Sequence, residues 1–101
     1  MLTHIVVWKY RTETDAAARE DHVALLRRLP SLMDGIESFA AGFDTLYLAR
    51  SYDTGLVAVF RDRAALDAYT IHPEHVKVAD FGRGISEHVA SVDFESEDEA
   101  T

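Results

Sequence analysis

The first predicted element is a strand over residues 3–10, because side chains there alternate between two faces. One face carries His4, Val6, Trp8 and Tyr10, and the other carries Ile5, Val7 and Lys9. Both faces are therefore largely apolar. Residues 56–60 are apolar throughout and predict a second strand of this kind. Two further strands are predicted over residues 36–43 and 88–94.

The first predicted helix lies between two clear boundaries. Thr12 or Thr14 can act as its N-cap, and Pro30 ends it, because the residue before a proline is held out of helical geometry. Its buried stripe recurs at helical spacing and consists of Ala18, His22, Leu25, Leu26 and Leu29.

Two more helices are predicted near residue 72. Asp62 caps a short helix that must stop near His72. Pro73 then opens the last helix, since proline is favoured at the first helical position, and its inward-facing residues include Val76 and Ala79.

The predicted order is β-α-β-β-α-α-β, which is the ferredoxin-like split βαβ arrangement with one extra helix. We therefore predict an α+β sandwich in which helices cover one face of a four-stranded antiparallel sheet. The strands at residues 4–10 and 56–60 are apolar on the other face as well. An apolar sheet face normally marks an interface, and a second copy packed sheet to sheet would cover it. The sequence thus predicts a homodimer.

Composition narrows the classes of function. The 101 residues suffice for one domain, predicted over residues 1–95, followed by an acidic C-terminal tail over residues 96–101. Without cysteine, the chain has neither a disulfide framework nor a thiolate nucleophile. The net charge of −8 disfavours nucleic acid and anionic membrane surfaces as partners. No apolar run approaches a membrane span and no basic signal-peptide start is present, so a cytoplasmic location is expected.

The segment His72-Pro73-Glu74-His75 carries the most specific chemistry in the chain. With Pro73 at the first helical position, His72 is the N-cap and His75 lies in the first turn. The partial positive charge of a helix N-terminus disfavours a second positive charge, so His75 is expected to be neutral at physiological pH. A neutral imidazole can accept a proton, which makes His75 a candidate general base with the Tyr69 phenol as its partner.

Two other interpretations fit the same residues. His72 can simply cap the helix while His75 packs with one hydrogen bond. The His-x-x-His spacing can also supply half of a metal site, but two ligands are too few and the rest would have to come from carboxylates or a distant histidine. We predict neither a metal nor a cofactor.

Together these residues resemble the stress-responsive A/B barrel (Dabb) family over nearly the whole chain. The matching segments are His4-Ile5-Val6 with Lys9, Gly35-Ile36-Glu37-Ser38-Phe39 with Gly42, Ser51-Tyr52-Asp53, and Phe60 through Leu66-Asp67-Ala68-Tyr69 to His72-Pro73-Glu74-His75-Val76. The resemblance implies a dimeric α/β barrel. It does not by itself imply a reaction, because this fold serves as a scaffold for several functions.

The chain is also similar to olivetolic acid cyclase, a plant polyketide cyclase of this family that closes a ring by an intramolecular aldol condensation without a cofactor. That similarity implies a catalytic pair of His75 and Tyr69. It implies a substrate-binding pocket that includes His4, with Trp8 and His72 as further binding residues. A pocket histidine associated with the third strand has no counterpart, and Thr54 stands there.

Three functions follow as hypotheses. The first is a cofactor-independent polyketide cyclase or lyase that acts on a small aromatic or polyketide-like ligand. The second is a non-catalytic dimer that binds a small apolar ligand or supports a stress response. The third, implied by the shared barrel fold alone, is a cofactor-free monooxygenase. A Tyr69–His75 pair that faces a pocket would favour the first.

Overall fold

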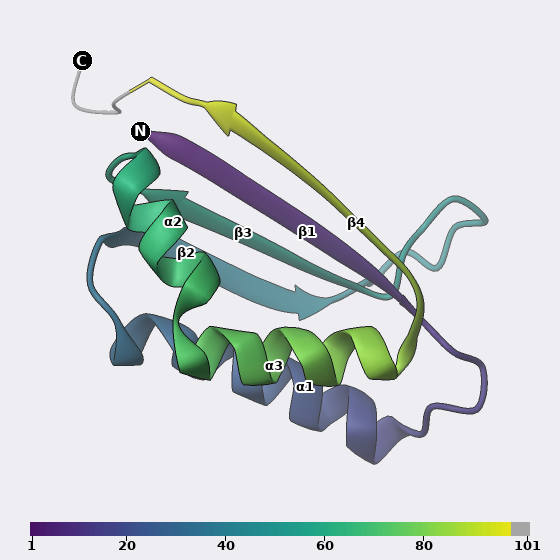
Figure 1. Cartoon of the computed structure of the whole chain (residues 1–101). Coiled ribbons are helices and arrows are strands. Elements are labelled where there is room, and N and C mark those ends of the chain that lie inside the picture. The colour runs from purple at the N-terminus through teal and green to yellow at the C-terminus, as the bar shows by residue number, and fades with distance from the viewer. Residues whose placement is uncertain (98–101) are drawn as a thin grey trace.

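A four-stranded sheet forms one layer of the protein, and helices form the other (Figure 1). The computed structural model describes residues 1–97. Its elements are β1 (Leu2–Tyr10), α1 (Ala16–Arg28), the 3-10 helix η1 (Leu29–Leu32), β2 (Ile36–Phe43), β3 (Thr54–Phe60), α2 (Arg63–Ile71), α3 (Pro73–Gly84) and β4 (Ser86–Glu95). The strand order is β2-β3-β1-β4, and every neighbouring pair is antiparallel. The predicted ferredoxin-like α+β fold is confirmed.

The helix boundaries follow from their caps, with one correction. Asp15 caps α1, because its side chain accepts a hydrogen bond from the Ala18 N–H at 2.9 Å. The predicted cap, Thr12 or Thr14, is wrong, since the Thr14 hydroxyl instead donates to the Ile85 carbonyl at 2.9 Å. Pro30 does end the α-helix, but the chain continues through one turn of 3-10 helix.

The core lies between the sheet and the helices. Its largest fully buried side chains are those of Phe60, Leu29, His22, Val23 and Thr54. The prediction that Val76 faces inward is wrong, because Val78 and Gly82 are the buried residues of α3. These two positions are four residues apart and share one side of the helix, whereas Val76 is rotated away from them.

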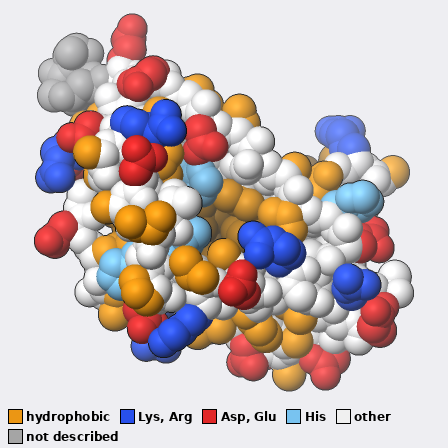
Figure 2. Space-filling model, in the orientation of Figure 1, with side chains coloured by type: hydrophobic (Ala, Val, Ile, Leu, Met, Phe, Trp, Pro, Cys, Tyr) orange, Lys and Arg blue, Asp and Glu red, His pale blue; other side chains and the backbone are white. Residues whose placement is uncertain are grey.

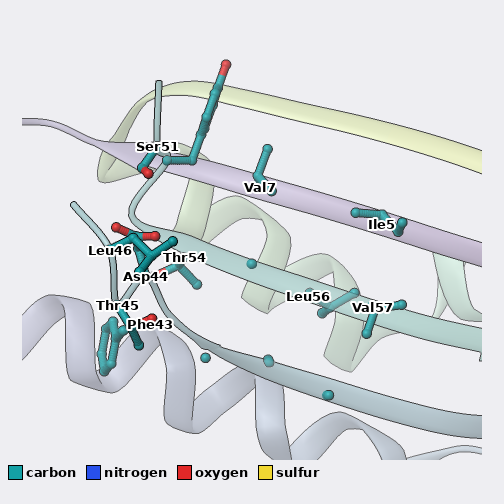
Figure 3. A pocket seen from close by; sticks show the side chains of 15 residues that line it. Ile5, Val7, Phe43, Asp44, Thr45, Leu46, Ser51, Thr54, Leu56 and Val57 are labelled. Carbon is teal, nitrogen blue, oxygen red and sulfur yellow. The ribbon is translucent and has the colours of Figure 1, made fainter. Parts of the chain in front are cut away.

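The opposite face of the sheet is apolar and has no layer over it in the single chain. Ile5 and Val7 rise from β1 on the side away from the helices (Figure 3). Val57 pairs with Ile5 across β1 and β3 and is 40% exposed. Val92 of β4 also pairs with Ile5 and is exposed. The loop of residues 44–53 borders a broad groove on this face.

The two ends of the described chain lie next to each other. The Met1 ammonium donates to the Ser96 carbonyl at 3.0 Å, and the Ser96 N–H donates to the Met1 carbonyl at 2.8 Å. Most of the predicted acidic tail, residues 98–101, lies outside the described residues. Among residues 1–97, none of the helices has the length and apolar character needed to cross a membrane.

Candidate active site

A cavity of about 200 Å³ opens between the sheet and the α2–α3 pair. Its lining includes His4, Val6 and Trp8 from β1, Tyr69 from α2, and His75 and Val78 from α3. On this face of the molecule, apolar side chains surround a hollow, and histidine side chains lie at its edge (Figure 2). The cavity therefore combines apolar walls with a few polar groups, as small-molecule sites do.

Tyr69 and His75 come together because a sharp turn separates their helices. Tyr69 lies in the last turn of α2, and His75 lies in the first turn of α3. Their ring centroids are 4.2 Å apart, with the ring planes inclined at 40°. Tyr69 is 3% exposed, and burial raises the pKa of its phenol. The phenol is therefore protonated at neutral pH, and Tyr69 lines the cavity as a potential hydrogen-bond donor.

Hydrogen bonding fixes which nitrogen of His75 can act as a base. Its Nδ1 lies 3.1 Å from the Thr70 carbonyl oxygen. A carbonyl can only accept a hydrogen bond, so Nδ1 carries the proton and Nε2 keeps its lone pair. Burial lowers the pKa of His75, an effect that the bond to Thr70 opposes and that the charges of His4, His72 and Arg83 reinforce. The pKa of His75 is thus shifted in the direction predicted from the helix N-terminus, but burial is the leading cause of the shift.

His4 reaches the cavity from the opposite side, held by a residue that the sequence did not indicate. Its Nδ1 is hydrogen-bonded to the carboxylate of Asp93 on β4. The two residues are direct partners in the antiparallel register of β1 and β4. The His4 ring meets Tyr69 edge to face, with centroids 6.1 Å apart. Tyr69 therefore has two imidazole rings next to it, those of His4 and His75.

Trp8 lines the cavity and packs against a buried polar cluster. Its ring centroid lies 4.8 Å from that of His22, which is 0% exposed. The Tyr10 hydroxyl lies 2.8 Å from His22 Nδ1 and 2.7 Å from the Thr54 hydroxyl. Burial lowers the pKa of His22 to about 4, so this imidazole is neutral at physiological pH. The cluster thus holds Trp8 in place without adding charge to the core.

Comparison with known proteins assigns the family. The family model described as "Stress responsive A/B Barrel Domain" matches residues 2–96. The chain belongs to this family. No curated protein matches the chain in sequence.

Several solved structures share the fold of this chain. A dimeric ferredoxin-like protein of unknown function from Thermobifida fusca is 22% identical, with a TM-score of 0.85 over 92% of this chain and 88% of that one. A dimeric ferredoxin-like protein of unknown function from a Jannaschia species is 27% identical, with a TM-score of 0.80 over 94% of this chain and 98% of that one. A hydroxynitrile lyase from Passiflora edulis is 14% identical, with a TM-score of 0.82 over 92% and 90%.

Two residues singled out in this A/B barrel chain lie outside the cavity. His72 does not line it. Instead its Nδ1 accepts a hydrogen bond from the Glu74 N–H at 3.1 Å, which directs the ring to the start of α3 as a cap. Thr54, at the position of the missing pocket histidine, is buried with Tyr10 in the core. His72 therefore caps α3, as one interpretation of the sequence predicted, and its binding role stays a prediction.

A group of three or more His, Cys, Asp or Glu side chains placed to hold a metal ion is not found within residues 1–97.

Proposed function

We propose that this stress-responsive A/B barrel protein is a homodimeric, cofactor-independent acid–base enzyme of the cyclase or lyase type. Its substrate is a small aromatic or polyketide-like carbonyl compound. The observation that carries this proposal is the Tyr69–His75 pair, with centroids 4.2 Å apart on the wall of an apolar cavity. One member of the pair can accept a proton, and the other can only donate one at neutral pH.

The reaction starts at a carbon next to a carbonyl group. His75 Nε2 removes a proton from this carbon, and the Tyr69 hydroxyl donates a hydrogen bond to the oxygen on which negative charge develops. The carbanion then attacks a second carbonyl carbon of the same molecule and forms a carbon–carbon bond. The alkoxide takes the proton back from the His75 imidazolium, which leaves His75 neutral again. The atoms and charges balance without a further reactant.

The fold and its relatives support this chemistry and the dimer. A hydroxynitrile lyase occurs among the structural neighbours, so another protein of this fold carries a lyase activity. Neighbours from Thermobifida fusca, Bacteroides fragilis and Jannaschia are described as dimeric. The uncovered apolar face that includes Ile5, Val57 and Val92 supports a sheet-to-sheet homodimer. Burial of that face would remove it from water and stabilise the association.

Deuterium exchange into a probe ketone tests the proposed function. Phenylacetone in D₂O loses its methylene proton signals in the NMR spectrum as the protons on the carbon next to the carbonyl exchange for deuterium. We expect the protein to accelerate this loss, and His75→Gln to reduce the acceleration by about 100-fold or more. Tyr69→Phe should also slow the exchange, because the oxyanion loses its donor.

Two control variants show whether a loss of exchange is specific to residues of the cavity. His88→Gln removes an exposed imidazole on β4 that does not line the cavity, and Tyr47→Phe alters a tyrosine that is 83% exposed. Both should leave the exchange rate unchanged. Exchange no faster than in buffer, or equal rates in the wild type and His75→Gln, would contradict the proposed reaction. Ligand binding without exchange would instead favour a non-catalytic binding protein, which the apolar lining of the cavity also suits.

A further inference from the structure

The charge of the cavity differs from that of the whole chain. The protein has 18 acidic residues and a net charge of −8. Yet the ionisable side chains that line the cavity are His4, Tyr69, His75 and Arg83, with no Asp or Glu among the lining residues. Around the hollow in Figure 2, histidine and basic side chains lie close to its apolar surface. The lining of this cavity therefore carries basic side chains and no carboxylate, although the protein as a whole is acidic. This local charge favours an anionic ligand.

Arg83 supplies the permanent positive charge. It follows His75 by eight residues on α3, which corresponds to about 12 Å along the helix axis. Its Nη1 donates to Asp80 at 3.1 Å. A guanidinium has five N–H donors in a planar fork, so this bond leaves Nε and Nη2 for a ligand. The side chain is 71% exposed, which places the free donors where a ligand can enter.

The electrostatic influence of Arg83 extends to the other end of the cavity. Its charge is among the causes that lower the pKa of His75. Both residues also line the same cavity. Between them the lining is apolar and includes Val6, Val78 and Ala79. A ligand that satisfies both ends needs an anionic group, an apolar body and a carbonyl group.

We propose that the cavity binds an apolar carboxylate, with Arg83 holding the carboxylate group at the entrance while the apolar body extends toward Tyr69 and His75. The inference rests on the proposed function, because it takes this cavity as the substrate site. A carboxylate fits better than a phosphate, since the lining offers one guanidinium and no lysine, which balances the single charge of a carboxylate better than the higher charge of a phosphate. The volume of about 200 Å³ suits one ring with a short chain.

An isosteric pair of probes tests the inference without a known substrate. Calorimetry compares 4-propylbenzoate with its neutral amide, 4-propylbenzamide, at about pH 8, where histidines are largely neutral. We expect the benzoate to bind at least about 10-fold more tightly than the amide, and Arg83→Gln to abolish this preference. Arg83→Lys keeps the charge but not the fork and should retain part of it. Arg63→Gln is the matched control, because Arg63 is also exposed and also paired with a helical aspartate, Asp67, but lies outside the cavity.

The outcomes separate this inference from the proposed function. Equal affinities for acid and amide, no binding of either, or a preference that survives Arg83→Gln would overturn the carboxylate site. Benzoate binding that depends on Arg83 supports it even when no deuterium exchange into phenylacetone is found. In that case the carboxylate site stands and the catalytic proposal fails.

Discussion

The side chains of His4 and Asp93 are hydrogen-bonded across two neighbouring strands, 89 residues apart in the sequence. The carboxylate accepts from Nδ1 of the imidazole, so in the neutral ring the lone pair lies on Nε2 of His4, as it does in the neutral ring of His75. Asp93 thus sets the orientation and the tautomer of a histidine that touches the Tyr69 ring. In their neutral forms, the two imidazoles next to the Tyr69 phenol thus share one tautomer, with the proton on Nδ1.

Removing Asp93 should free His4. In Asp93→Ala we expect the hydrogen-bonded Nδ1–H proton signal of His4 to disappear from the NMR spectrum, because the imidazole loses the acceptor that holds it. Asp93→Asn keeps an acceptor oxygen and should retain the signal. Glu95→Ala is the control, since Glu95 lies two residues farther along the same face of β4. An unchanged His4 signal in Asp93→Ala would show that this contact does not orient the ring.

Val57 and Val76 provide a matched test of the dimer. They are 40% and 41% exposed in the single chain, but Val57 lies on the open face of the sheet and Val76 on α3. We expect Val57→Asp to give monomers in sedimentation velocity at micromolar concentration, because dimerisation would bury an unpaired carboxylate at a cost of several kcal/mol. Val76→Asp should remain a dimer. A wild-type protein that sediments as a stable folded monomer would contradict the homodimer.

Gly82 allows α3 to approach β1 closely. A Cβ atom added there would lie 2.5 Å from His22 Nε2 and 3.1 Å from Trp8 Nε1. We expect Gly82→Ala to lower the free energy of unfolding by about 1–3 kcal/mol, measured by urea denaturation, because the buried rings must shift. At Gly84 an added Cβ meets nothing within 4 Å. Gly84→Ala should therefore be neutral or stabilising by up to about 1 kcal/mol. Equal effects at the two positions would refute the close approach.

Local signals in the sequence were sufficient for most of the fold. Alternation marked β1, and Pro73 marked the start of α3, because each depends only on neighbouring residues. The choice of Asp15 over Thr14 as the cap of α1 was missed, since both residue types cap helices well. The rotation of α3 about its axis, which buries Val78 rather than Val76, depends on how the helix packs on the sheet and was also missed.

The site was only partly predictable for a related reason. His75 and Tyr69 are six residues apart, on either side of the predicted boundary between two helices, so their proximity followed from the motif. The role of Asp93 needed the register of β1 with β4. A polar residue at position 93 on the same face as His4 was the available signal, but it can be used only once the two strands are aligned. Arg83 was missed because its place at the cavity depends on the length and phase of α3.

Stability should fall in mild acid because of His22. Its pKa is lowered from 6.5 to about 4 by burial, so the unfolded chain binds this proton first as the pH falls. His22 should therefore lower the free energy of unfolding between about pH 6.5 and about pH 4, by up to about 3 kcal/mol, and its contribution should stay constant below that range. His22→Gln removes the titrating group, so its urea denaturation midpoint should show a smaller loss over this range. An identical pH dependence in both proteins would exclude His22 as the cause.

The state of His75 tests the central claim most directly, because a base must be neutral where it acts and the measurement needs no substrate. NMR titration of its ring, with ¹⁵N shifts to identify the tautomer, reports both properties at once. We predict a pKa for His75 below its ordinary value of 6.5, with the neutral ring protonated at Nδ1. A pKa above 6.5, or a neutral ring protonated at Nε2, would contradict the account and leave His75 as a packed histidine next to a helix cap.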